Sequence, residues 1–179
     1  NGLLLEAGAS VHPETIEHQR EPEISADRFA VLDLDTGVLF RASPTYVRFP
    51  STVTNLKFSA SYVTGSHAFK TGVMTMNGCR TSLTYANNDM SLRFRSGVPN
   101  SVTQYATPYT SKDCIKQNIS LYAQDQWKID RLTVNLGTRF DWFGGYVPAT
   151  HLDATRYVPF AQDFARVDDA PNLKDLSPR

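Results

Sequence analysis

Two sets of side chains alternate along residues 132–141, which read LTVNLGTRFD. One set is apolar and comprises Leu132, Val134, Leu136 and Phe140. The set between them is polar and includes Asn135, Arg139 and Asp141. A period of two predicts a β-strand with one apolar face and one polar face. Either a protein core or a lipid bilayer can cover the apolar face, and the period alone does not separate these possibilities.

Strand patterns recur along most of the chain. Further strands are predicted at residues 3–10, 55–64, 67–76 and 118–127, with shorter hairpins at residues 29–41 and 90–107. The alternation places Lys57 and Lys70 on the polar faces of their strands. Residues 13–29 have sparse apolar positions and an internal proline, so we expect a polar loop there. The sequence therefore predicts an all-β chain whose neighbouring strands are antiparallel.

The connections between these strands alternate in length. Short turns are predicted at Gly65-Ser66 and near Asp130, whereas long polar connections are predicted at residues 11–54, 77–117 and 144–177. Outer-membrane barrels combine short periplasmic turns with long outer loops, and tilted strands of about ten residues are long enough to cross a bilayer. This asymmetry favours a lipid-covered barrel.

Aromatic residues collect near the predicted strand ends. The group near the short turns comprises Tyr62, Phe69 and Trp127, and the group near the long connections comprises Phe140, Trp142 and Phe143. Membrane barrels carry aromatic girdles at both interfaces, which fits this distribution. Asp125 is evidence against a lipid-covered barrel, because it shares parity with Leu121 and Ala123 on an apolar face. Its closeness to the turn makes it tolerable there.

Composition narrows the functional classes. Lysine plus arginine and aspartate plus glutamate number 18 each, so no net positive field attracts nucleic acid, and no nucleic-acid partner is expected. No apolar run approaches the roughly 20 residues of a membrane-spanning helix. The chain starts without methionine or a targeting segment, and we interpret it as part of a longer protein.

Several stretches together resemble a known family. Residues 121–141, LYAQDQWKIDRLTVNLGTRFD, resemble the Y-x-Q-D-x-W…R-L-T-x-N-x-G-x-R-Y-D strand pair of TonB-dependent outer-membrane receptors. Residues 61–72, SYVTGSHAFKTG, resemble the G-x-H-x-F-K-x-G hairpin of the same family. Residues 92–108 and the closing APNLKDLSPR resemble the Oar-like branch. The resemblance extends from about Asn55 to Arg179.

The resemblance implies a barrel of about 22 antiparallel strands with a folded plug, which imports bulky nutrients using energy passed on by TonB. Residues 1–179 would then be one part of the barrel, without the plug and without the remaining strands. The sequence predicts five membrane-spanning strands, which are too few to close such a barrel. Expected partners are outer-membrane lipid, the plug and remaining strands, TonB through a region absent here, and an unidentified cargo.

This interpretation assigns one of the two alternating faces to lipid and the other to the barrel lumen. The lipid-facing set would be Leu132, Val134, Leu136 and Phe140. The lumen-facing polar set would be Lys57, Lys70, Asn135, Arg139 and Asp141. Four outer-loop tyrosines, at positions where cargo would first be met, are Tyr105, Tyr109, Tyr146 and Tyr157.

Other candidate chemistry is sparse. Cys79 and Cys114 fall in the predicted 77–117 connection, where they either form a disulfide or remain free thiols. The four histidines are scattered rather than set at metal-ligand spacing, and no cofactor is expected. No hydrolase elbow, zinc-protease motif or phosphate loop is present, so an enzyme is not expected. The alternative function is a secreted or surface β-sandwich that binds carbohydrate through exposed aromatic residues.

Overall fold

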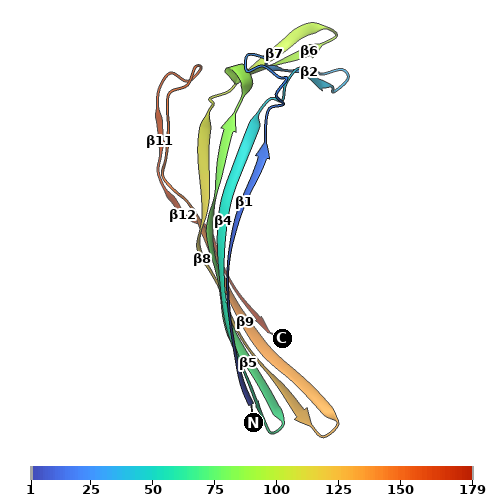
Figure 1. The fold of residues 1–179 in the computed structure, drawn as a ribbon, viewed down its shortest axis with the longest axis vertical. Helices are drawn as coiled ribbons and strands as arrows, with labels where there is room; N and C mark the ends of the chain where they lie inside the picture. Colours follow the sequence, from blue (N-terminus) through green and yellow to red (C-terminus); the bar gives the residue numbers. More distant parts are fainter. Residues whose placement is uncertain (1, 179) are drawn as a thin grey trace.

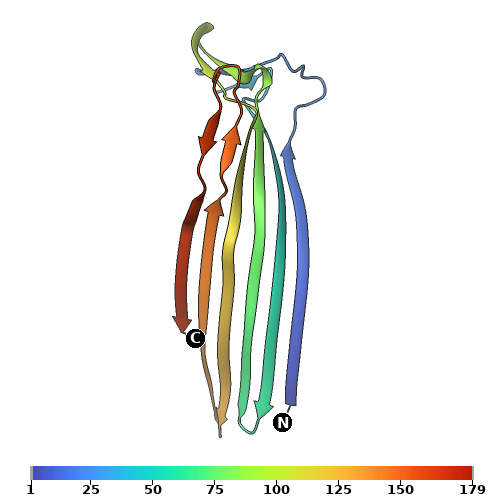
Figure 2. The same ribbon diagram turned by 90° about the vertical axis from the view of Figure 1, so that its left-hand side faces the viewer.

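Long antiparallel strands dominate the structure, a computed structural model that describes residues 2–178. Six of them form one sheet in the order β1-β4-β5-β8-β9-β12 (Figure 2). Their bounds are β1 (Gly2–His18), β4 (Tyr46–Thr64), β5 (His67–Tyr85), β8 (Tyr109–Ile129), β9 (Leu132–Val147) and β12 (Val167–Pro178). The predicted all-β, antiparallel fold is confirmed. The sheet is open, with β1 and β12 at its two edges.

Two tight turns lie together at one end of this sheet, which we call the turn end. Gly65 and Ser66 join β4 to β5, and Asp130 and Arg131 join β8 to β9. Gly65 has a φ of 54° and Asp130 a φ of 51°, the left-handed conformation that two-residue hairpin turns require. All longer connections within residues 2–178 lie at the opposite end, the loop end (Figure 2). The predicted asymmetry of the connections is confirmed.

The strands are about twice as long as the sequence pattern predicts. β4 and β5 each contain 19 residues and β8 contains 21. The expected long connections at residues 11–54, 77–117 and 144–177 are therefore wrong in their bounds. The loop-end halves of the strands have polar residues on both faces, as in residues 77–82, and so lack the period of two by which strands are recognised.

The predicted polar loop at residues 13–29 is also wrong in its first part. Residues 13–18 continue β1 and pair with residues 47–52 of β4. Pro13 has no N–H to donate to a ladder, but β1 lies at the sheet edge, where proline is tolerated. The long sheet has six strands, one more than the five predicted from the sequence, because β12 forms at the other edge from residues expected in a long connection.

Smaller elements gather at the loop end (Figure 1). A four-stranded sheet contains β3 (Leu39–Phe40), β2 (Ala30–Asp33), β6 (Met90–Arg95) and β7 (Val98–Gln104), in that order. The β2–β3 and β6–β7 hairpins follow the prediction, whereas β2 pairs with β6 in parallel, which the sequence did not predict.

The other loop-end elements are β10 (Thr150–Leu152), β11 (Gln162–Phe164) and the 3-10 turn Asn87–Asp89. No helix within residues 2–178 is long and apolar enough to cross a membrane. A small core lies at the loop end, where Ala30, Val31 and Tyr46 are at most 3% exposed. The long sheet itself has no packed second layer in residues 2–178.

Candidate functional site: the two faces of the long sheet

The strand register collects the apolar side chains of all six long strands on one face. Phe140 of β9 lies opposite Leu121 of β8, which lies opposite Val73 of β5. The complete row across the sheet is Ala7, Phe58, Val73, Leu121, Phe140 and Leu176. This apolar face is therefore a property of the whole sheet and not of one strand.

The apolar face contains the four residues expected to face lipid. It bears Leu132, Val134, Leu136 and Phe140, together with Leu56, Phe58, Tyr62, Phe69, Val73, Leu121 and Trp127. Leu121 is 47% exposed and Leu136 is 59% exposed, because nothing in residues 2–178 covers them. The four-stranded sheet lies beyond the ends of the long strands and is not stacked on them (Figure 1). The sandwich arrangement of the alternative interpretation is not observed in residues 2–178.

The height of the apolar face matches a membrane. It extends along β9 from Leu132 to Trp142, a distance of roughly 33 Å at the usual strand rise. A strand tilt of about 40° reduces this to a band of about 25 Å, the height of the apolar belt of outer-membrane barrels. Beyond Trp142 the same face carries polar residues such as Thr54 and Asn77.

Trp142 marks the loop-end boundary of this band. Its Nε1 donates a hydrogen bond of 2.9 Å to Oδ1 of Asn172, and Nζ of Lys174 lies 4.8 Å from the centre of its ring. A ring with one polar edge and an apolar body suits an interface between water and hydrocarbon. Phe143, expected in the same girdle, lies instead on the opposite face, because it pairs with Asn118.

His67 and Asp125 form a polar pair at the turn-end boundary of the apolar face. Nδ1 of His67 lies 2.6 Å from Oδ2 of Asp125, and the His67 ring stacks on Phe69 and Trp127 at 5.3 Å each. The pair explains how a carboxylate is accommodated among apolar neighbours. Oδ1 of Asp125 is buried and has no hydrogen-bond partner within residues 2–178.

The opposite, polar face carries the five residues expected to face the lumen. They are Lys57, Lys70, Asn135, Arg139 and Asp141, and the register places all of them on the same side. Nε and Nη2 of Arg139 donate to the two carboxylate oxygens of Asp141 at 2.7 and 2.9 Å. Ser120 donates to Asp141 and accepts from Arg139 Nη2 at 3.0 Å. This fork ties β8 to β9.

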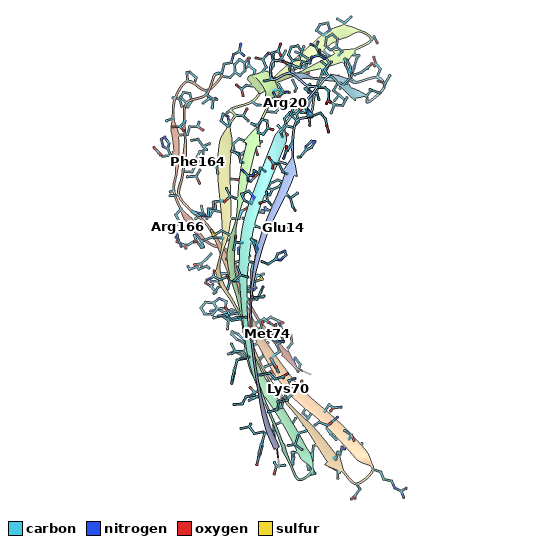
Figure 3. The ribbon with its side chains drawn as sticks, viewed as in Figure 1. Glu14, Arg20, Lys70, Met74, Phe164 and Arg166 are labelled. Atoms are coloured by element: carbon cyan, nitrogen blue, oxygen red, sulfur yellow. A yellow bond between two sulfur atoms is a disulfide. The ribbon has the colours of Figure 1, made fainter. Side chains whose placement is uncertain are left out.

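A second polar cluster ties β1, β4 and β5 together. Ser59 donates to Glu6 at 3.0 Å, and Nζ of Lys70, the residue labelled in Figure 3, lies 3.8 Å from the same carboxylate. The Tyr122 side chain lies directly over Gly72, where an added Cβ would be 2.7 Å from the tyrosine ring. Two oppositely charged pairs therefore lie on this face, Lys70–Glu6 between β5 and β1 and Arg139–Asp141 within β9.

The two cysteines lie in the ladder and not in a loop. Cys79 of β5 is directly opposite Cys114 of β8, with Cα atoms 4.1 Å apart and sulfur atoms 2.03 Å apart in a disulfide. The expected position within a long outer connection is therefore wrong. The bridge joins the two strands on the loop-end side of the apolar band.

The pairing register is irregular in β8 and β12 at a similar height of the sheet. β8 has an extra residue at Lys116, and β12 is shifted between Asp168 and Asn172. Nζ of Lys116 lies 3.1 Å from Asp169 and 3.5 Å from Asp168. β-Bulges bend and twist a strand, so the loop-end part of the sheet is directed differently from the apolar band.

Within residues 2–178 no group of three or more His, Cys, Asp or Glu side chains could hold a metal ion. The Arg139–Asp141–Ser120 fork has its polar atoms engaged with each other.

Comparison with known proteins agrees with this geometry. A family model described as TonB dependent receptor-like, beta-barrel matches residues 21–179. Comparisons with curated proteins and with solved structures gave no match. The matched region contains five of the six long strands in full and all of the loop-end elements. With most of its length matched, the chain belongs to the TonB-dependent receptor-like β-barrel family, a family of outer-membrane receptors and transporters.

Proposed function

We propose that this chain forms one wall of the barrel of an Oar-like receptor that imports a bulky nutrient across the outer membrane. The observation that carries the proposal is the apolar face, which crosses all six long strands and is uncovered. Each large apolar side chain removed from water contributes about 1.5–3 kcal/mol. Lipid can remove this entire face from water, which no other element of residues 2–178 does.

This proposal assigns a direction to each part of the sheet. Leu132, Val134, Leu136 and Phe140 contact hydrocarbon, and the polar face lines the lumen, where it meets a plug domain. The turn end then lies in the periplasm, and the loop end lies outside the cell. Compensated pairs such as Arg139–Asp141 are suited to such a wall, because they give polar contacts without a net charge that would trap passing cargo.

The open edges of the sheet indicate which partners it needs. β1 and β12 each leave one edge of hydrogen-bonding groups unpaired, and six strands are too few to close a barrel of this family. Further strands of the same receptor would pair with both edges. Energy for import would come from TonB through a region outside these residues.

Spin labels test the assignment of the two faces. In the intact receptor in liposomes, single labels at positions 119–124 of β8 should alternate in their accessibility to oxygen, which concentrates in lipid. Labels replacing Leu121 and Ala123 should be more accessible to oxygen than labels replacing Tyr122 and Gln124, which lie on the polar face. A uniform profile, or the reverse alternation, would show that lipid does not cover the apolar face.

A further inference from the structure

A cavity of about 550 Å³ opens at the loop end of the long sheet. Its walls include Val47 and Phe49 of β4, Thr84 of β5, Tyr109 of β8, Tyr105 before β8 and Leu152 of β10. Val47 and Phe49 share parity with Lys57, and the β4–β5 register has no shift between them. The cavity therefore lies on the same side of the sheet as the polar face. Its volume is within the usual range for small-molecule sites.

Hydrogen bonds hold the wall formed by the β7–β8 connection. The backbone N–H of Tyr105 donates to the Asp89 carbonyl at 2.9 Å, and its hydroxyl lies 3.0 Å from that of Ser91. Thr107 is 3% exposed, donates to the Asp89 carboxylate at 2.5 Å and accepts from the N–H of Ala86 at 3.2 Å. These contacts place the Tyr105 ring in the cavity before any ligand arrives.

The chemistry of the lining is neutral. Aromatic rings, aliphatic side chains and hydroxyl groups provide its surface, and no charged side chain is among the lining residues. The guanidinium of Arg80 lies 5.7 Å from the Phe49 ring, but it is paired with Asp113 at 3.2 Å. An anionic ligand, such as a ferric chelate with free carboxylates, would find no unpaired cation there. A ligand with apolar faces and neutral hydroxyl groups matches both kinds of lining group.

We propose that this cavity binds a neutral oligosaccharide. Sugar rings present C–H faces that pack on tyrosine and phenylalanine rings, while their hydroxyl groups exchange hydrogen bonds with serine, threonine and tyrosine. This inference rests on the proposed function, because it takes the cavity as the outer part of the import path. It also separates the four outer tyrosines, since Tyr105 and Tyr109 line the cavity whereas Tyr146 and Tyr157 pack beneath arginines elsewhere.

Calorimetry on the intact receptor in detergent tests the proposal. The probes are maltohexaose, cellohexaose, xylohexaose and mannohexaose, with hexagalacturonate as an anionic sugar of the same length. At least one neutral sugar should bind, and hexagalacturonate should bind at least about tenfold more weakly. Tyr109→Ala and, independently, Phe49→Ala should each weaken binding of the neutral sugar about fivefold to tenfold. Tyr157→Ala is the matched control and should leave binding unchanged.

Two results would overturn the oligosaccharide proposal. One is that none of the neutral sugars binds, and the other is that binding persists unchanged in both the Tyr109 and the Phe49 variants. Heat-modifiable migration in gels verifies that each variant is still a folded barrel. The spin-label profile is independent of cargo, so a normal alternation together with no sugar binding rejects the ligand and leaves the barrel assignment in place.

Discussion

At the scale of single residues, positions that break the apolar or polar pattern are explained by their immediate partners. Asp125 breaks the pattern of the apolar face, and its carboxylate is hydrogen-bonded to His67, whose ring stacks on two aromatic rings. Trp142 lies at the opposite boundary, with its N–H bonded to Asn172. Both polar exceptions lie at the ends of the band and not in its middle, where an unpaired polar group would cost most.

His151 gives a residue-scale prediction that depends on pH. Its ring lies 2.6 Å from Asp163 across the β10–β11 hairpin and 3.5 Å from Asp153. The hydrogen bond to Asp163, then the charges of Asp163 and Asp153, raise the pKa of His151 above its ordinary value of 6.5. A raised pKa in the folded state means that protonation stabilises the hairpin. That contribution is complete below pH 6.5 and disappears as the pH rises through the folded pKa.

Histidine NMR of the intact receptor measures this directly, with His151→Gln used to assign the signal. Asp163→Asn should move the pKa of His151 down towards 6.5, and Asp153→Asn should move it less, because Asp163 supplies the larger effects. A pKa of His151 that stays the same in Asp163→Asn would contradict the pairing.

At the scale of elements, each long strand has two regions that differ in their pattern of apolar and polar residues. The turn-end half of each strand alternates because one face is apolar and the other is polar. The loop-end half carries polar residues on both faces and is held by additional cross-strand contacts, including the Cys79–Cys114 bridge and the Lys116 pairs. The bulges in β8 and β12 lie where one region changes into the other.

The disulfide gives an element-scale prediction. We expect Cys79 and Cys114 to be bridged in the native receptor, because the pair closes a loop of sequence separation 35 and lies in the proposed extracellular region. Thiol counting under denaturing, non-reducing conditions should find neither cysteine free. Replacing both by serine should cost about 3–4 kcal/mol in the unfolding free energy, by the loop-closure estimate.

Limited proteolysis gives a second readout of the same bridge. The doubly substituted receptor should be cut faster between β5 and β8, while cleavage of the β10–β11 hairpin, which the bridge does not restrain, should be unchanged. Two reactive thiols in the unreduced native receptor would refute the bridge.

At the scale of the whole molecule, the six-stranded sheet is not self-sufficient. It has an uncovered apolar face and two edges with unpaired backbone groups, and the small core near Tyr46 lies at one end. In outer-membrane barrels, lipid covers such a face and neighbouring strands pair with such edges. The same features make the isolated chain prone to pair with other copies of itself.

This leads to a prediction about the 179-residue chain by itself. Without detergent it should aggregate, and light scattering should increase as denaturant is diluted away. Serine at Leu56, Phe58, Leu121 and Leu136 should reduce the scattering, because these side chains belong to the apolar face. Serine at Val31 should not reduce it, since Val31 is buried in the small loop-end core. A soluble monomer of the unmodified chain would contradict the barrel assignment.

The sequence alone determined the strands of the band, their two faces and the tight turns. These depend on local information, since neighbours in a strand alternate sides and Gly65 or Asp130 permits a left-handed turn. The residues expected to share a face, from Lys57 to Asp141, do share one, because a constant antiparallel register carries parity from strand to strand. The motifs that resemble the receptor family lie in these same strands and turns.

Features that depend on pairing between distant segments become visible only in the folded chain. Residues 13–18 become strand because β4 offers them an edge, and Cys79 meets Cys114 because a bulge sets the β5–β8 register. The parallel β2–β6 pair and the tyrosine-lined cavity likewise join residues far apart in the chain. The residue pattern of a polar loop does not differ from that of a strand with water on both faces. Whether a polar segment forms a strand therefore depends on the segments that pair with it.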